Sequence, residues 1–257
     1  RCLNCKNPMC VKGCPVKTPI PQIIQSLKAG NLNKAGEMLF NNNPLSMMCA
    51  LVCNHGNQCE GHCVLGKKGI PVHFSTIEYY VSNTYFDKMR IECKPKIGKK
   101  VAVIGAGPAG ITIAFKLAEE GYDVVIFEAK EKIGGMLQYG IPDYRLPKTI
   151  LERYRQKLIE IGVQIRLDTS IGGTLEIADL FKDGYSSVFI GTGVWRSKKL
   201  GIYGETRGDV LYAINYLSNP DGHDVGETVA VIGAGNTAVV VARTCLRKGA
   251  RNVTLYA

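Results

Sequence analysis

The sequence lacks several features that would place it in other classes of protein. No apolar run approaches the length of a membrane span, so an integral membrane protein is not expected. The N-terminus lacks the charged and then apolar segment of a secretory signal, and no stretch is of low complexity. We therefore expect a soluble, cytoplasmic protein.

The sequence also lacks a nucleic-acid-binding patch. Its formal net charge is +10, but Lys and Arg are scattered, and no basic run is interleaved with aromatic residues. Neither nucleic acid nor a membrane is therefore expected as a partner. The basic balance suits an acidic protein partner or the phosphates of a dinucleotide.

Cysteine is the residue that the sequence has in excess. The chain of 257 residues contains ten cysteines, and eight of them lie within the first 63 positions. A secreted disulfide scaffold would be shorter and would not continue into nucleotide-binding motifs. In a reducing compartment, such a density of thiols indicates metal binding.

The eight N-terminal cysteines form two groups. The first comprises Cys2, Cys5, Cys10 and Cys14, and the second comprises Cys49, Cys53, Cys59 and Cys63. Short spacings, with the first group ending in Cys-Pro, are typical of iron–sulfur ligation, in which a more distant cysteine completes the cluster. Structural zinc is the alternative, but zinc sites usually pair two C-x2-C arms, and only one pair here has that spacing. The spacing favours iron–sulfur clusters without saying which cysteine joins which cluster.

Hydrophobic periodicity predicts an α/β protein with an N-terminal helical part. Helices are expected from Pro19 to Gly30, with Thr18 as N-cap, and at 32–40 and 75–87. Strand, helix and strand are then expected at 101–104, 109–120 and 124–127, followed by a helix at 147–162 and strands at 163–167 and 187–190. A second strand–helix–strand unit is expected at 229–256.

The pattern predicts three domains. A helical domain with two [4Fe-4S] clusters covers 1–92, the N-terminal part of a Rossmann-like FAD domain covers 93–200, and a Rossmann-like NAD(P)H domain begins at 201–257. Because a lone strand–helix–strand unit cannot close a sheet domain, we expect the chain to be a fragment of a longer protein.

The first dinucleotide fingerprint follows the strand at 101–104. Gly105 makes the tight turn, Gly107 lets the backbone approach a pyrophosphate, and Gly110 allows the helix to pack closely. The helix N-terminus faces the phosphates. Glu128, which ends the next strand, is placed to accept hydrogen bonds from ribose hydroxyls.

Two later glycine turns and one cation belong to the same candidate site. Gly134–Gly135 follows Glu128 closely, and the Gly191–Gly193 turn follows a strand. Arg145 is the best nearby cation, although a solvated arginine before a helix is the alternative interpretation.

The second fingerprint follows the strand at 229–232 and predicts the NAD(P)H site. Its residues are Gly233, Gly235, Asn236, Thr237 and Ala238. Ala238 stands where the third glycine is usual, a replacement that the fingerprint tolerates.

The order of these motifs resembles one superfamily of iron–sulfur flavoproteins. It comprises the glutamate synthase small (beta) subunit, the large subunit of NADH-dependent ferredoxin:NADP oxidoreductase and the N-terminal half of dihydropyrimidine dehydrogenase. The resemblance covers nearly the whole chain and includes the Gly-Ile-Pro-x2-Arg-Leu-Pro segment from Gly140 to Pro147.

The resemblance implies an oxidoreductase that feeds electrons to a partner. NAD(P)H would reduce FAD, and two [4Fe-4S] clusters would pass the electrons to a larger subunit, either the glutamate synthase large subunit or a ferredoxin-type acceptor. An electron-bifurcating ferredoxin:NADP oxidoreductase is the alternative enzyme. A zinc-stapled, non-catalytic binding module is the alternative outside enzymes.

The resemblance also implies how the cluster ligands divide. One cluster would take Cys2, Cys5, Cys10 and Cys63, and the other would take Cys14, Cys53, Cys59 and the carboxylate of Glu78. Cys49 would then be spare. From the sequence alone, the alternative is that Cys49 is the eighth ligand and Glu78 a surface residue.

For the flavin, the resemblance implies a longer list of contacts. The residues are Val52, Gly105, Ala106, Gly107, Pro108, Ala109, Gly110, Glu128, Gly135, Met136, Arg145, Ile171 and Gly193. One departure lies in the second fingerprint, where relatives commonly carry an acid two positions after Ala238 and this chain has Val240.

Overall fold

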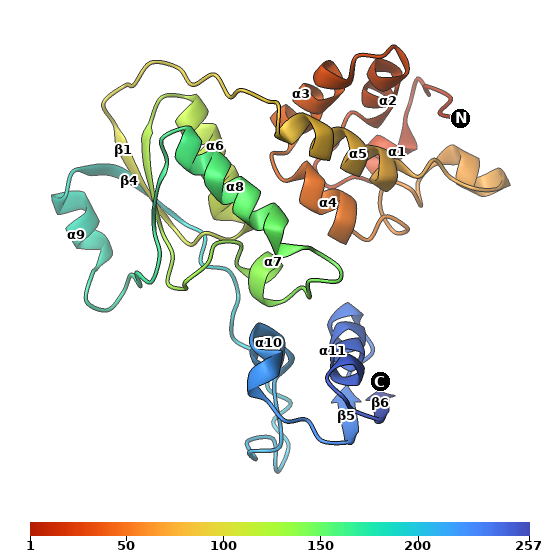
Figure 1. Ribbon diagram of the computed structural model, residues 1–257, viewed down its shortest axis with the longest axis vertical. Coiled ribbons are helices and arrows are strands. Elements are labelled where there is room, and N and C mark those ends of the chain that lie inside the picture. The colour runs from red at the N-terminus through yellow and green to blue at the C-terminus, as the bar shows by residue number, and fades with distance from the viewer. The chain divides into compact units, whose positions relative to one another are not determined.

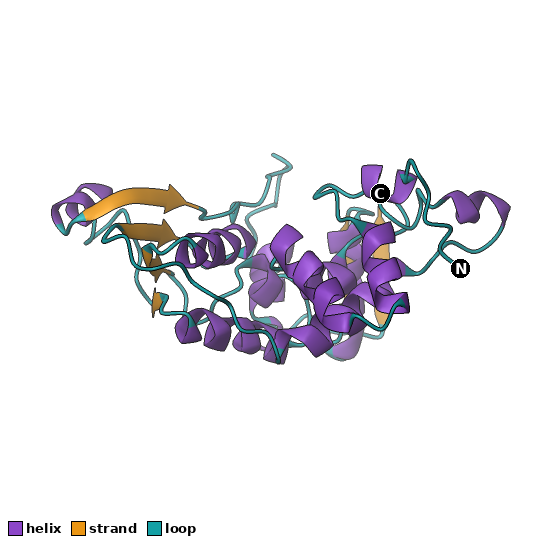
Figure 2. Ribbon diagram, turned by 90° about the horizontal axis from the view of Figure 1, so that it is seen from above, coloured by secondary structure: helices purple, strands orange, loops and turns teal.

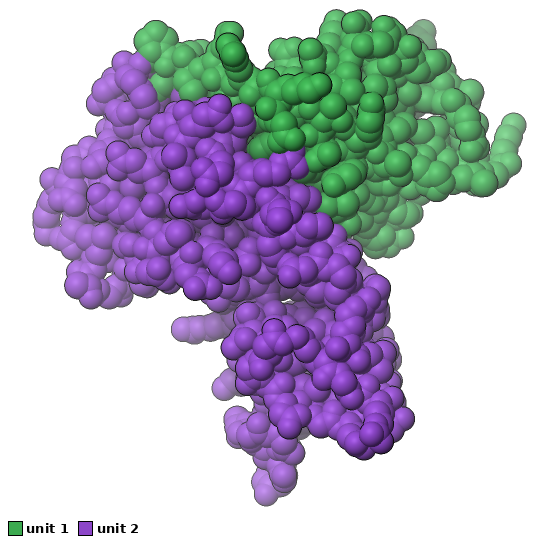
Figure 3. Space-filling view, in the orientation of Figure 1, with its two compact units in different colours: residues 1–95, 119–121 green, residues 96–118, 122–257 purple.

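The computed structural model describes residues 1–257 and divides into two compact units, coloured separately in Figure 3. Unit 1 comprises Arg1–Pro95 with Glu119–Gly121, and unit 2 comprises Lys96–Ala118 with Tyr122–Ala257. No helix is both long enough and apolar enough to cross a membrane.

Unit 1 is built from short helices (Figure 1). They are α1 (Met9–Lys12), α2 (Ile20–Lys28), α3 (Leu32–Asn42), α4 (Ser46–Val52), the 3-10 helix η1 (Val64–Lys68) and α5 (Phe74–Phe86). Helix α5 packs against both α3 and α4. The fully buried Ile23, Leu39 and Val81 come from three different helices and form the core. The three predicted helices are confirmed, whereas α1 and α4 were not predicted.

The predicted N-cap of the first helix is wrong by one residue. Pro19 is the N-cap of α2, has a non-helical ψ of 62°, and no side chain caps the helix. Thr18 is buried, and its hydroxyl instead lies 3.3 Å from the sulfur of Cys14. The side chain that should have capped the helix is therefore used to contact a candidate cluster ligand.

Unit 2 begins with a parallel four-stranded sheet in the order β3-β2-β1-β4. The strands are β1 (Lys100–Ile104), β2 (Asp123–Phe127), β3 (Gln164–Arg166) and β4 (Tyr185–Ile190), which run side by side in Figure 2. All four predicted strands are confirmed. Because the strands are parallel, their carboxyl ends meet at one edge, where nucleotides bind in this class of sheet.

Helices cover both faces of this sheet. On one face lie α6 (Pro108–Glu119) and α8 (Lys148–Glu160), adjacent in Figure 1, with the rings of Phe115 and Tyr154 packed edge to face at 6.1 Å. On the other face, Leu180 of α9 (Ile177–Lys182) packs against Ala102 and Phe127. The short helix α7 (Met136–Tyr139) lies between β2 and α8 in sequence.

The C-terminal part of unit 2 repeats the strand–helix–strand pattern, as predicted. It comprises α10 (Ala213–Ser218), the 3-10 helix η2 (Pro220–Gly222), β5 (Thr228–Ile232), α11 (Asn236–Arg247) and β6 (Asn252–Tyr256). Strands β5 and β6 pair in parallel as a separate two-stranded sheet. Cys245 and Tyr216 are the most buried members of its core.

Candidate cluster and nucleotide-binding sites

The four cysteines predicted to bind the first cluster surround one small cavity in unit 1. Cys2, Cys5, Cys10 and Cys63 all line it, together with Cys59 and apolar walls from α2 and the start of α5. Burial, together with the nearby thiols of Cys63 and Cys2, raises the pKa of Cys10 above its usual value. The four side chains therefore come together although they are up to 61 positions apart in the chain.

The second predicted set meets around Cys53. A hydrogen bond from Cys49 lowers the pKa of Cys53, against the opposing effects of burial and of Glu78, Cys59 and Cys14 nearby. Burial and the neighbouring Glu78 raise the pKa of Cys59 to about 12. These interactions connect Cys14, Cys53, Cys59 and Glu78, which is the set implied by the resemblance.

Glu78 is a buried acid. Its side chain on α5 is 5% exposed, and burial raises its pKa to about 9, with further contributions from Cys49 and Glu60. Such a carboxyl is costly to bury in its charged form unless a positive group is close. Metal coordination would supply that positive charge, so the donor set fits a cluster with one carboxylate ligand.

Cys49 belongs to the same neighbourhood as the second set. Its thiol hydrogen bonds with Cys53, and the side-chain amide of Asn43 donates a hydrogen bond to its sulfur at 3.1 Å. The alternative eighth ligand is thus adjacent to the set as well.

None of the ten cysteines is in a disulfide. No three His, Cys, Asp or Glu side chains come close enough together to hold a single metal ion. The thiols of the first set instead line a cavity.

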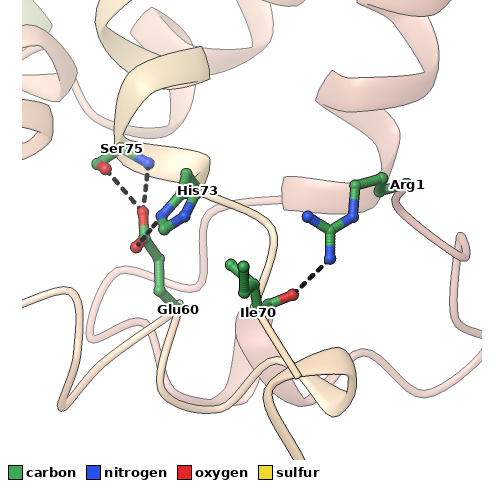
Figure 4. A network of polar contacts seen from close by, with 5 residues as sticks. All are labelled: Arg1, Glu60, Ile70, His73 and Ser75. Carbon is green, nitrogen blue, oxygen red and sulfur yellow. Dashed lines mark hydrogen bonds and ion pairs between the residues drawn. The ribbon is translucent and has the colours of Figure 1, made fainter. Parts of the chain in front are cut away.

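A polar network beside Cys59 anchors α5, the helix that carries Glu78 (Figure 4). The carboxylate of Glu60 accepts hydrogen bonds from the backbone N–H of Ser75 at 2.8 Å and from its hydroxyl at 2.7 Å. His73 lies 3.4 Å from the second carboxylate oxygen. Glu60 therefore caps the N-terminus of α5 and couples the segment containing Cys59 to that helix.

Three glycine turns converge at the carboxyl edge of the four-stranded sheet. Gly105 has φ +99°, and a Cβ there would lie 2.5 Å from the carbonyl oxygen of Gly191. A Cβ on Gly110 would overlap the carbonyl oxygen of Gly105. A Cβ on Gly135 would lie 3.0 Å from the Cα of Gly107, so all three turns pack backbone against backbone. Because no side chain stands on these glycine turns, a pyrophosphate has room at the start of α6.

Glu128 lies beside the first turn, as the fingerprint predicts. It is 8% exposed, and its carboxylate accepts hydrogen bonds from the backbone N–H groups of Ala106 at 2.7 Å and Lys130 at 2.9 Å.

The other residues predicted for the flavin are spread more widely. Pro108, Ala109 and Met136 are at helix N-termini, and Arg145 is half-buried before α8. Ile171 pairs with Leu175 in an isolated bridge and packs against the sheet core. Gly193 has φ +72° after β4. Val52 ends α4 in unit 1, whereas the rest belong to unit 2.

The second fingerprint forms a similar turn. Gly233 has φ +123°, its N–H donates to the carbonyl oxygen of Tyr256 at 2.6 Å, and Gly235 is the N-cap of α11. Asn236 and Thr237 are exposed on the first turn of the helix. A Cβ on Gly233 would lie 3.7 Å from that of Ala238, an ordinary contact, so alanine fits at the third position here. Val240 is buried in the core of this part of unit 2.

Sequence reasoning did not single out two cationic side chains near the glycine turns of the first fingerprint. Lys148, at the start of α8, is half-buried and donates hydrogen bonds to the carbonyl oxygens of Leu137, at 2.8 Å, and Ile141. Lys130 lies over the rings of Tyr139 and Trp195. The only available signal was proximity in sequence to the predicted glycine turns.

Comparison with known families agrees with this architecture. Residues 99–257 match the family of pyridine nucleotide-disulphide oxidoreductases, and residues 1–90 match dihydropyrimidine dehydrogenase domain II, 4Fe-4S cluster. The chain therefore belongs to the pyridine nucleotide-disulphide oxidoreductases, in a form with an N-terminal iron–sulfur domain. Within that class it is a member of the iron–sulfur flavoprotein superfamily that includes the glutamate synthase small chain, and its cofactors are FAD, 4Fe-4S and NAD(P)H.

Individual relatives support the assignment. The chain is 34% identical to glutamate synthase [NADPH] small chain of Escherichia coli (strain K12), over 99% of this chain and 57% of that protein. It is 35% identical to NADPH-Fe(3+) oxidoreductase subunit beta of Geobacter sulfurreducens, over 96% of this chain and 38% of that protein. The chain thus spans about half the length of these relatives or less.

A solved structure of 2-naphthoyl-CoA reductase, in complex with 2-naphthoyl-CoA, is similar in fold. The identity is 26% and the TM-score 0.53, over 68% of this chain and 26% of that one.

Proposed function

We propose that the protein containing this chain is the electron-input subunit of a larger cytoplasmic redox enzyme, in the first instance glutamate synthase. The identity of 34% to a glutamate synthase small chain, over 99% of this chain, supports that assignment. When bound, FAD would take two electrons from NAD(P)H as a hydride, and two [4Fe-4S] clusters would carry them singly toward the partner.

The observation that carries the proposal is the division of the cysteines into two neighbourhoods. Cys10 interacts with Cys2 and Cys63, whereas Cys53 interacts with Cys14, Cys59 and Glu78. Cys59 also lines the cavity of the first set, so the two neighbourhoods adjoin each other, and we take them as the sites of two clusters. We assign the first cluster to Cys2, Cys5, Cys10 and Cys63, and the second to Cys14, Cys53, Cys59 and Glu78.

The remaining residues bind and orient the nucleotides. The backbone at Gly105–Gly110 would receive the FAD pyrophosphate, and Glu128 would accept hydrogen bonds from a ribose. The turn at Gly233–Ala238 would receive the pyrophosphate of NAD(P)H in the same way. We propose the same division into cluster, FAD and NAD(P)H domains at 1–92, 93–200 and 201–257.

Metal analysis of the full-length protein, purified anaerobically, tests the proposal. About eight irons, equivalent sulfide and one FAD are expected. Zinc without iron or flavin would contradict it and favour the zinc-stapled module.

Variants test the ligand sets. C10S and C14S should each remove a different one of two low-temperature EPR signals of the reduced protein, and C93S, outside both sets, should remove neither. Loss of the second signal in E78A but not in C49A would identify Glu78 as the eighth ligand, and the reverse result would identify Cys49. If C10S and C14S abolish the same signal, the two-set assignment is wrong.

The identity of the electron acceptor needs a separate test. With a glutamate synthase large subunit, NADPH oxidation should depend on glutamine and 2-oxoglutarate. The 35% identity to an NADPH-Fe(3+) oxidoreductase subunit supports a second candidate, the same input module with another acceptor. Ferredoxin-dependent or ferric reduction without glutamate formation would favour that candidate.

A further inference from the structure

Three side chains near the predicted flavin site pack together without having been predicted from the sequence. The ammonium of Lys130 lies 4.1 Å from the ring centroid of Trp195 and 4.3 Å from that of Tyr139. The two rings meet at 6.2 Å with an interplanar angle of 67°. One cation is thus shared by two aromatic faces, an arrangement in which the ring quadrupoles attract the charge.

The three residues come from three segments that reach the carboxyl edge of the sheet. Lys130 follows β2, Tyr139 ends α7, and Trp195 follows β4. These segments carry Glu128, the Gly134–Gly135 turn and the Gly191–Gly193 turn, which form the candidate flavin site.

Each member also makes a hydrogen bond to a segment of the candidate flavin site. The backbone N–H of Lys130 donates to the Glu128 carboxylate at 2.9 Å. The hydroxyl of Tyr139 accepts from the backbone N–H of Lys132 at 3.2 Å. The indole N–H of Trp195 donates to the carbonyl oxygen of Thr192 at 3.0 Å. A displacement of any one ring would therefore move a segment of the flavin site.

The segment after β4 has few other anchors. Thr192, Gly193, Val194 and Arg196 are exposed, with Val194 at 86%, and the stretch itself is neither helix nor strand. Trp195 is the half-buried residue among them. Its contact with Lys130 therefore has a large influence on where the Gly191–Gly193 turn lies.

We propose that Lys130, Tyr139 and Trp195 form a clamp that holds the segment after β4 against the segments after β2, and so positions the glycine turns for FAD before the cofactor binds. Lys130 is a positioning residue in this clamp and need not contact the flavin itself. The proposal rests on FAD binding by this unit, as assigned above.

The electrostatic surroundings agree with this location. Burial raises the pKa of Tyr139, with further contributions from the nearby carboxylates of Glu131, Glu128 and Asp168, while the hydrogen bond from Lys132 opposes them. The clamp is therefore next to the Glu128 carboxylate and not on a remote surface.

The same sheet provides a matched control. Lys100 lies 4.1 Å from the ring centroid of Tyr185, where β1 and β4 begin. This pair is also a lysine over an aromatic ring, but it lies at the amino edge of the sheet, away from the glycine turns. Substitution by methionine in either pair removes the charge and keeps a side chain of similar length.

The test compares K130M, W195L and K100M in the full-length protein after removal of FAD. K130M and W195L should raise the Kd for FAD about five- to thirty-fold, the range that two cation–π contacts correspond to. K100M should change it less than about two-fold. A second measurement is acrylamide quenching of Trp195 without FAD, obtained by subtracting the signal of W195F. Quenching should increase in K130M and not in K100M.

Equal effects of K130M and K100M on FAD affinity, or unchanged affinity and quenching in K130M, would overturn the clamp. Failure of the wild-type protein to bind FAD would instead contradict the proposed function. The two failures are therefore distinguishable.

Discussion

The carboxylate of Glu128 and the backbone N–H of Ala106 are joined by a 2.7 Å hydrogen bond across 22 positions of sequence. The bond attaches the end of β2 to the tight turn after β1. The second carboxylate oxygen is used by the N–H of Lys130. A residue expected to bind ribose thus also stabilises the tight turn, because a buried carboxylate needs donors of its own.

Substitution of Glu128 by Gln should weaken the turn and FAD binding together. The amide keeps one acceptor but presents an NH2 group to one of the two N–H donors, at a cost of about 1–3 kcal/mol. We expect a lower free energy of unfolding in urea without FAD and a higher Kd for FAD. E131Q, at an exposed neighbouring position, is the control and should change neither.

The two fingerprints should respond differently at their third position. In Gly110→Ala the new Cβ would overlap the Gly105 carbonyl oxygen, so we expect a loss of more than about 2 kcal/mol and of bound FAD. The reverse change in the second fingerprint, Ala238→Gly, should cost only about 1 kcal/mol, from helix propensity. For each variant, thermal unfolding measures the loss of stability and the flavin content measures the bound FAD. Equal losses would show that the close approach at Gly110 is unimportant.

Lys148 should make stability depend on alkaline pH. Burial lowers the pKa of its ammonium, and Asp143, 4.0 Å away, opposes that effect only in part. Between the lowered pKa and 10.5 the unfolded chain binds more protons than the folded one, so the free energy of unfolding contributed by Lys148 rises with pH there. Relative to K148M, the wild-type protein should gain stability as the pH approaches 10.5. A constant difference between the two proteins in urea unfolding across that range would contradict the assignment.

Removal of one of the two hydrogen bonds between Ser75 and Glu60 should loosen α5, the helix that carries Glu78. Ser75→Ala deletes the hydroxyl that donates to Glu60 at 2.7 Å and leaves the backbone donor in place. We expect a loss of about 1 kcal/mol in urea unfolding. Thr84→Ala is a matched control, because that hydroxyl donates only to the carbonyl oxygen of Tyr80 within the same helix. Equal destabilisation by both changes would count against a special role of the Glu60 contact.

Much of the fold could be predicted from local patterns in the sequence. The strands at 101–104 and 229–232, each followed by a glycine turn and a helix, were predicted nearly to the residue, because turn, helix start and strand periodicity are encoded within about thirty positions. The short helices α1, α4, α7, α9 and α10 were not predicted, because each has fewer than eight residues and its position depends on packing.

By itself, the sequence determined that this protein has two glycine turns with the dinucleotide fingerprint and eight thiols with iron–sulfur spacing, because glycine and cysteine spacing is a property of the local chain. Only the tertiary structure decided which groups meet. It placed Cys63 beside Cys10, brought buried Glu78 to Cys53, and set Lys130 between Tyr139 and Trp195. Those contacts join segments that are distant in sequence. The packing of the helices and the sheet determines which segments become neighbours, and residue spacing does not predict that packing.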